Sequence, residues 1–137
     1  MSFVLDSSVS LAWCFDDERT DATDALLERV VDFGAVAPAL WPLEVLNALA
    51  MAERRSRIDA DRRQRLAGFL HDLPVAIDDD TVSQAWGVTS QLAARFRLTV
   101  YDAVYLELAQ RHRLPLATLD QELRAAAAAL GVVLLGT

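Results

Sequence analysis

Phe3-Val4-Leu5-Asp6-Ser7-Ser8 is a short apolar run that ends abruptly in polar residues. Such a run predicts a buried strand that stops at a turn. Similar apolar runs recur at residues 35–37, 74–77, 116–118 and 132–135, and helical patterns separate them. Short strands that alternate with helices are typical of an α/β protein with a parallel sheet. We therefore expect residues 1–137 to form a single domain around a central, mainly parallel sheet of four to five strands.

The segments between these strands carry helical signals. Residues 22–33 place apolar side chains on one helical face, and Gly34 should end that helix. We expect Cys14 in the core, and Trp13, Trp41 and Trp86 in the core or in an interface, because all four lie in apolar patterns. Further helices are predicted at residues 41–57, after Asp59, and at residues 78–96, 99–112 and 120–130.

The charge of the chain excludes several classes of function. A net charge of −7 and a pI of about 4.7 mean that bulk electrostatics cannot hold RNA, so any contact must be local or carried by metal ions. All 13 basic residues are arginine, and the lack of lysine excludes the usual P-loop motif and Schiff-base chemistry. Because we find neither a secretory signal nor an apolar run that spans a membrane, we expect a cytoplasmic protein without membrane contact.

Two aspartates follow predicted strands. Asp6 comes directly after residues 3–5, and Asp120 comes shortly after residues 116–118. In parallel α/β sheets, ligands bind beyond the carboxyl ends of the strands, so both side chains are candidates for a functional site. The alternative is that each aspartate only caps the helix that follows it.

Two further acidic residues lie in predicted helices. Glu44 belongs to a helix that is apolar on nearly every side, which predicts a buried carboxylate that must be paired or bound to metal. Asn47 lies one turn further along the same face. Asp102 falls at the third position of a helix that Thr99 can cap. The alternatives are an ion pair with arginine or a solvated edge for Glu44, and a first-turn position that favours the helix dipole for Asp102.

A cluster of these four carboxylates would have a specific chemistry. Ionised carboxylates within a few ångströms of one another raise one another's pKa unless a cation is present. Oxygen ligands suit hard ions such as Mg²⁺ or Mn²⁺. One or two such ions can activate water and stabilise the charge on a phosphate. The sequence therefore predicts metal-dependent phosphodiester hydrolysis by Asp6, Glu44, Asp102 and Asp120.

Four segments that span nearly the whole chain resemble PIN-domain nucleases, and specifically the VapC-type toxins of bacterial toxin–antitoxin pairs. They occur in the family's order at residues 4–8, 39–48, 98–109 and 116–123. The resemblance implies a three-layer α/β/α fold with carboxylates that converge at one edge of the sheet. The family's acidic positions fall on the same four carboxylates, and none of them is replaced. Ser8 and Thr118 match hydroxyl positions near the metal, with turn and cap chemistry as the alternative.

For function, the resemblance implies an endoribonuclease that depends on Mg²⁺ or Mn²⁺ and usually works as a homodimer. It also implies a small VapB-like antitoxin as partner, which blocks the site. Both implications are expectations that the sequence by itself does not test.

Basic residues concentrate in one short segment. Residues 54–65 hold six of the arginines and only two aspartates, although the chain as a whole is acidic. Arg54, Arg55 and Arg57 are therefore candidates for contacts with the phosphates of RNA. The alternative is a solvated tip between two helices.

Two rival functions remain open at this point. The same fold could act mainly as a binding module that docks to its partner with little turnover. It could also be a Mg²⁺-dependent phosphoesterase that acts on DNA or on another phosphate ester. Metal-dependent cleavage of purified RNA, compared with DNA and small phosphate esters, separates these functions.

Overall fold

A five-stranded parallel sheet forms the centre of the computed structural model, which describes residues 2–137. Its strands are β1 (Val4–Leu5), β2 (Ala35–Ala37), β3 (Val75–Ile77), β4 (Leu116–Ala117) and β5 (Leu134–Leu135). The spatial order is β3-β2-β1-β4-β5, so β1 is the central strand. Val4 accordingly pairs with Val36 on one side and with Leu116 on the other. The predicted parallel sheet of four to five strands is confirmed.

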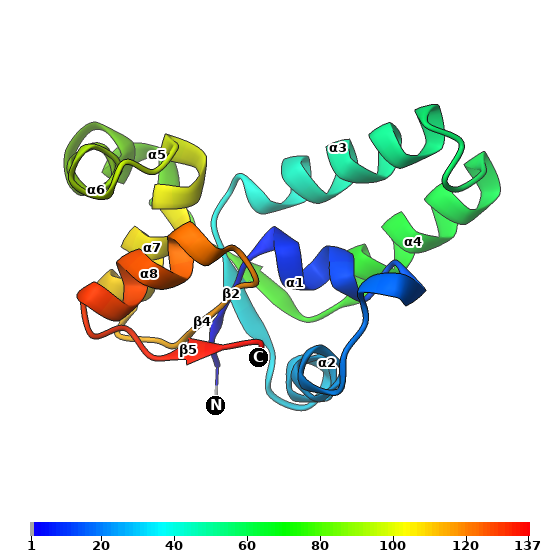
Figure 1. Cartoon of the computed structure of the whole chain (residues 1–137), viewed down its shortest axis with the longest axis horizontal. Helices are drawn as coiled ribbons and strands as arrows, with labels where there is room; N and C mark the ends of the chain where they lie inside the picture. Colours follow the sequence, from blue (N-terminus) through cyan, green and yellow to red (C-terminus); the bar gives the residue numbers. More distant parts are fainter. Residues whose placement is uncertain (1) are drawn as a thin grey trace.

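Helices cover both faces of the sheet (Figure 1). α7 and α8 lie on one side of the strands, and α1 and α2 lie on the other. α3 and α4 form a hairpin that projects from the body of the molecule, and α5 and α6 project at the opposite end. The helices are α1 (Ser7–Ala12), the 3₁₀ helix η1 (Asp16–Glu18), α2 (Asp21–Phe33), α3 (Trp41–Arg54), α4 (Ala60–Asp72), α5 (Thr81–Gln84), the π-helical segment η2 (Ala85–Thr89), α6 (Ser90–Phe96), α7 (Val100–His112) and α8 (Gln121–Ala129).

The ends of α2 follow local signals in the sequence. Thr20 and Thr23 form a reciprocal capping box at its first turn. Gly34 follows its last residue with φ of 76° and leads the chain into β2. A Cβ atom at Gly34 would lie 3.0 Å from the Pro74 carbonyl oxygen, so both the backbone angle and the available space favour glycine there. The predicted helix stop at Gly34 is confirmed.

The core lies on both faces of the sheet, against α7 and α8 on one side and against α1 and α2 on the other. All residues of β1 and β4 are buried, and α7 is buried without interruption from Ala103 to Ala109. Cys14 is also buried, as predicted, and burial raises the pKa of its thiol to about 11. None of the helices within residues 2–137 combines the length and the apolar character that a membrane crossing requires.

The helix predicted at residues 78–96 is interrupted. Gly87 has non-helical angles, φ −121° and ψ −105°, so the segment consists of α5, η2 and α6. Trp13 and Trp41 are buried, but Trp86 lies beside this interruption with 91% of its surface exposed. The core prediction is therefore wrong for Trp86, and an interface remains its expected environment.

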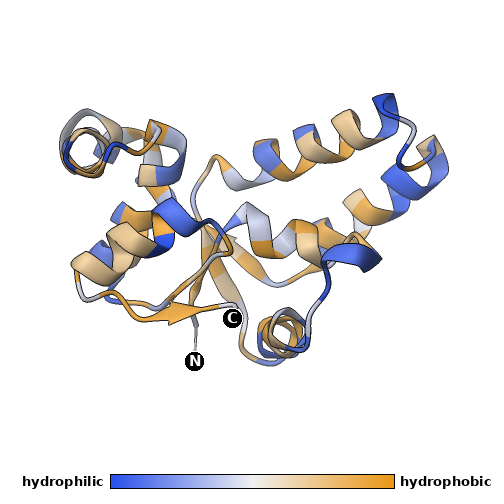
Figure 2. Cartoon of the chain, viewed as in Figure 1, coloured by the Kyte–Doolittle hydropathy of each residue, from blue (hydrophilic) through white to orange (hydrophobic). Residues whose placement is uncertain are grey.

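α3 also differs from its prediction. It ends at Arg54 instead of Arg57, because Ser56 adopts a φ of 61° and turns the chain. The helix is not buried on all sides, since Leu43 is 66% exposed and Leu46 is 48% exposed. The reason is that the α3–α4 hairpin projects from the body, and Figure 2 shows hydrophilic residues at the tip where the two helices meet.

Candidate active site

Asp6 lies at the carboxyl end of the central strand, and only 4% of its surface is exposed. Its Oδ2 atom accepts hydrogen bonds from the hydroxyls of Ser8, at 2.6 Å, and Thr118, at 2.8 Å. The hydrogen bonds between β1 and β4 continue to Asp6, because the Asp6 amide donates to the Ala117 carbonyl at 3.0 Å. The structure therefore places both hydroxyl residues named from the sequence against Asp6.

The same hydroxyls hold the loop that follows β4. Ser8 Oγ accepts a hydrogen bond from the Leu119 amide at 2.9 Å, and Thr118 Oγ1 accepts one from the Asp120 amide at 3.1 Å. Asp120 Oδ1 accepts from the Leu123 amide at 2.9 Å, so Asp120 does cap α8. Asp6 differs, because it occupies the N-cap position of α1 but makes no side-chain cap hydrogen bond.

Glu44 lies in the first turn of α3 and faces α7. Its Oε1 atom accepts a hydrogen bond from the Tyr105 hydroxyl, and it forms no ion pair with arginine within residues 2–137. Partial burial raises the pKa of Glu44, and the charges of Asp6 and Asp102 raise it further, while the Tyr105 hydrogen bond opposes these effects. Glu44 is therefore near two of the other three carboxylates.

Asp102 lies in the first turn of α7, as predicted. Thr99 caps this helix by accepting a hydrogen bond from the Asp102 amide at 3.1 Å. Burial raises the pKa of the Asp102 carboxyl, and the nearby charges of Asp120 and Asp6 raise it further. Glu122 adds a smaller effect in the same direction. Asp102 therefore lies near both Asp6, which follows β1, and Asp120, which follows β4.

The electrostatics of this edge favour a cation. Burial also raises the pKa of Asp6, although the Ser8 and Thr118 hydroxyls and two backbone amides oppose the shift. Carboxylates that are costly to ionise together are stabilised by a divalent ion, and their oxygen atoms suit Mg²⁺ or Mn²⁺. Within residues 2–137, however, no three carboxylate, imidazole or thiolate groups already form a metal-binding set. Metal binding by these carboxylates remains a prediction.

Two residues near this site were missing from the sequence prediction. Tyr105 is buried on α7 and holds Glu44, and its position three residues after Asp102 puts both on one helical face. Glu122 follows Asp120 by two residues and is an additional carboxylate near Asp102. By contrast, Asn47 is exposed and makes no side-chain hydrogen bond within residues 2–137.

The predicted arginine contacts differ in their surroundings. Arg57 Nη2 lies 2.8 Å from Asp17 Oδ1 and 3.1 Å from Glu18 Oε2, so its charge is already compensated. Arg54 and Arg55 are exposed at the end of α3, and neither guanidinium has an ion pair or hydrogen bond within the described part of the chain.

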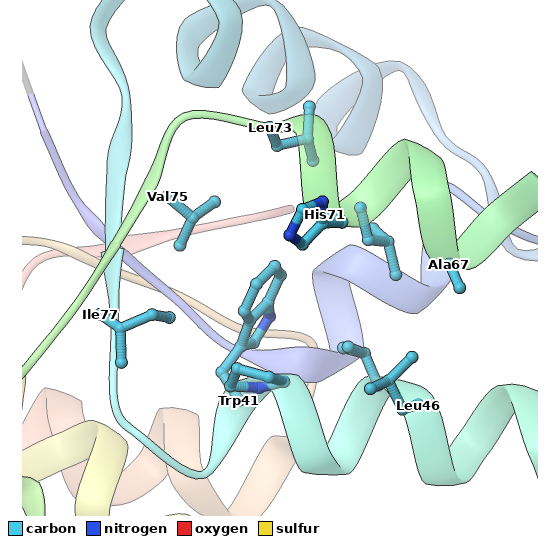
Figure 3. Close-up of a pocket in the computed structure, with 10 residues that line it drawn as sticks. Trp41, Leu46, Ala67, His71, Leu73, Val75 and Ile77 are labelled. Atoms are coloured by element: carbon cyan, nitrogen blue, oxygen red, sulfur yellow. The ribbon is translucent and has the colours of Figure 1, made fainter.

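A groove of about 280 Å³ lies between α3, α4 and β3 (Figure 3). Figure 3 places the Trp41 ring in its centre and His71 close to that ring. The lining is mostly apolar and includes no carboxylate. This groove can bind apolar groups, but the four candidate carboxylates lie outside it, after β1 and β4 and in the first turns of α3 and α7.

Solved structures have the same fold. PAE2754 from Pyrobaculum aerophilum gives a TM-score of 0.70 at 23% identity, covering 98% of this chain and 89% of that one. FitAcB from Neisseria gonorrhoeae gives 0.68 at 16% identity, covering 99% and 97%. VapBC2 from Rickettsia felis, bound to a DNA fragment from its promoter, gives 0.66 at 10% identity, covering 99% and 98%.

Sequence comparison agrees with this likeness and extends it. The chain is 26% identical to ribonuclease VapC3 of Pyrobaculum aerophilum over 123 residues. This alignment covers 90% of the chain and 92% of VapC3. The family model of the PIN domain matches residues 3–129, which include all four predicted carboxylates. This chain therefore belongs to the PIN-domain family.

Proposed function

We propose that this protein is a metal-dependent endoribonuclease and the toxin of a toxin–antitoxin pair. The observation that carries the proposal is the gathering of Asp6, Glu44, Asp102 and Asp120 at one edge of the sheet. Burial raises the pKa of the first three, and neighbouring carboxylates raise the pKa of Glu44 and Asp102 further. The likeness to ribonuclease VapC3 supports RNA as the substrate. The oxygen-only set of side chains supports Mg²⁺ or Mn²⁺ as the cofactor.

In this mechanism, Asp6, Glu44, Asp102 and Asp120 would hold the divalent cation. A divalent ion supplies charge stabilisation on the phosphate and a lower pKa for a water molecule. Both hydroxyls on Asp6 Oδ2 fix the direction of that carboxylate, and its Oδ1 atom receives no side-chain hydrogen bond. Tyr105 holds Glu44 from α7, and Thr99 places Asp102 by capping the same helix. These supports keep the acidic groups in position against their mutual repulsion.

The proposed partner is a small antitoxin. Support comes from the relatives, since the FitAcB and VapBC2 structures share this fold over nearly their full length. The VapBC2 complex is bound to DNA from its promoter, so we expect the antitoxin of this chain to be a DNA-binding protein. A stoichiometric antitoxin should stop RNA cleavage by the purified chain.

The first test is cleavage of purified RNA with and without divalent cations. Mg²⁺ or Mn²⁺ should support cleavage, and EDTA should abolish it. Asp6→Asn and Asp102→Asn should each lower kcat/KM by more than about 100-fold, because each removes a proposed ligand. Asp32→Asn is the matched control, since Asp32 is exposed in the last turn of α2, before the amino end of β2, whereas the site lies at the carboxyl edge of the sheet.

Circular dichroism and thermal unfolding establish that each variant is folded. Full activity in a folded Asp102→Asn protein would contradict the mechanism. Cleavage of DNA or of small phosphate esters in preference to RNA would replace the proposed substrate. Tight antitoxin binding without any metal-dependent cleavage would favour a binding module.

A further inference from the structure

A second groove, of about 340 Å³, lies between α1 and α3. Its floor is made by Leu11 and Phe15 from one side and by Ala48, Met51 and Ala52 from the other. Glu18 also lines the groove, and its carboxylate is paired with Arg57. Arg55 and Arg57 line the same groove at the end of α3. Both arginines are among the candidates for phosphate contacts that the sequence predicts.

The groove leads toward the carboxylates. Glu44, Ala48 and Met51 of α3 and the C-cap residue Arg55 follow one another at spacings of four, three and four residues, so they form one stripe along this side of the helix. Eleven helical residues span about 16 Å, which separates the acidic end of the stripe from its basic end. The opposite wall of the groove is formed by α1, which starts at Ser7, directly after Asp6. Leu11 of this wall lies one helical turn after Ser7.

The two arginines of the groove differ in available charge. Arg57 is paired with Asp17 and Glu18, and its guanidinium stacks on the Phe15 ring at 3.9 Å. The Arg55 guanidinium forms no ion pair or hydrogen bond within residues 2–137. Arg55 is therefore the groove cation that can neutralise an incoming anion, while Arg57 forms part of the wall.

Nearby arginines do not offer the same contact. Arg63 is paired with Glu53, and Arg65 is paired with Asp61. Arg54 is unpaired within the described residues, but it is rotated by about 100° from Arg55 around the helix axis and does not line the groove. The free positive charge in the groove therefore comes from one guanidinium.

An apolar floor with one free cation at its end fits a strand in which bases and phosphates alternate. Bases can contact an apolar floor only where they are unpaired, as in single-stranded RNA. We propose that this groove binds the single-stranded RNA next to the cleaved phosphate, with unpaired bases on the floor and Arg55 on a phosphate. This inference rests on the proposed ribonuclease function and adds the path of the substrate.

Binding of a short fluorescent single-stranded RNA tests the proposal independently of turnover. The measurements use fluorescence anisotropy in an Asp6→Asn background, which prevents cleavage during the titration. Adding Arg55→Gln should weaken binding about fivefold and reduce the slope of log Kd against log salt by about 0.7, because one phosphate contact is lost. Adding Arg54→Gln should change Kd less than twofold, although it removes the same charge one residue away. Double-stranded RNA of the same sequence should bind without dependence on Arg55.

Each outcome decides one of the two proposals. Equal losses of RNA affinity in the Arg54→Gln and Arg55→Gln proteins would mean that only the total charge of the protein matters. Unchanged affinity in both proteins would mean that Arg55 does not contact the RNA. Either result would overturn the proposal that this groove binds RNA. If the wild-type protein cleaves RNA but Arg55→Gln does not change the Kd for RNA, the proposed function stands and the groove proposal fails. A protein that never cleaves RNA but binds it through Arg55 loses the proposed function and keeps the groove.

Discussion

The Asp6 carboxylate uses its two oxygen atoms differently. Oδ2 is held by the hydroxyls of Ser8 and Thr118, which come from opposite ends of the chain. The sequence indicated Asp6 by its position after a buried strand, and it indicated Ser8 and Thr118 through the family resemblance. It could not establish that both hydroxyls meet on one oxygen atom, because that contact depends on which strands become neighbours.

Glu44 shows where residue-level prediction fails. Its apolar sequence neighbours suggested full burial, but Leu43 and Leu46 point to solvent and the carboxylate is only partly buried. The contact that defines its environment comes from Tyr105, which lies 61 residues away on α7. Helical periodicity reports which side chains share a face, but it does not report what packs against that face.

The first prediction concerns the charge of Asp102. Its pKa is raised in the folded metal-free protein, so ionisation of this group opposes folding. The penalty is absent below the unfolded pKa of about 3.9 and becomes complete as pH rises through the folded pKa. Metal-free Asp102→Asn should therefore melt roughly 2–4 °C above the wild type at pH 7.5.

Calorimetry in EDTA across pH 3.5–8 measures this difference. The gap between Asp102→Asn and wild type should close toward the acid end, and Asp32→Asn should show no gap at any pH. A metal-free Asp102→Asn protein that melts below the wild type at pH 7.5 would show that the carboxylate is not repelled by its neighbours.

Among the helices and strands, the structure differs most from the sequence prediction where a helix is interrupted or very short. The segment from α5 to α6 reads as one helix by its apolar pattern, but Gly87 breaks it. α1, with six residues, is too short to give a periodic pattern in the sequence. The longer helices were found because several turns of periodicity and a capping residue agree, as for α7 with Thr99.

A buried ion cluster ties the end of α7 to the segment after β3. Arg111 donates to both oxygens of Glu107 and to both oxygens of Asp78. The side chains of Glu107 and Asp78 are 4% and 7% exposed. Removal of the guanidinium would leave two buried carboxylates without their cation.

The second prediction follows from this cluster. Arg111→Met should lower the free energy of unfolding at pH 7 by about 2–4 kcal/mol, because a broken buried pair leaves an uncompensated charge. The Arg111 guanidinium lowers the pKa of Asp78, so this stabilisation exists above the unfolded pKa and disappears as pH falls through the lower, folded value. Urea unfolding at pH 7 and pH 3 measures both effects. Arg95→Met, an exposed exchange of the same type, should have little effect, and an equal loss there would refute the role of the cluster.

At the scale of the whole molecule, one apolar surface has no cover. Leu43 of α3, Val82 of α5, and Val100 and Tyr101 of α7 are exposed and border a shallow apolar pocket. Trp86 lies one turn after Val82, so it extends the same surface. Clustered exposed apolar side chains mark interaction sites more often than free surface.

We expect this surface to join two copies of the chain, which agrees with the homodimer implied by the resemblance. Trp86→Glu should convert the dimer into a monomer, because each interface would bury an unpaired charge. Sedimentation velocity at several protein concentrations measures the change. Phe33→Glu is the matched control, since Phe33 is 65% exposed on α2 and lies outside this surface. A Trp86→Glu protein that still sediments as a dimer would place the interface elsewhere.

The contact between Asp6 and Thr118 joins residues that are 112 positions apart. Ribosomes add roughly 5–20 residues per second, so about 6–22 s pass between the synthesis of the two partners. For most of that interval the nascent chain lacks α7 and β4, and throughout it the chain lacks Asp120. A growing polypeptide therefore has no assembled nuclease centre with which to cut the message that is still encoding it.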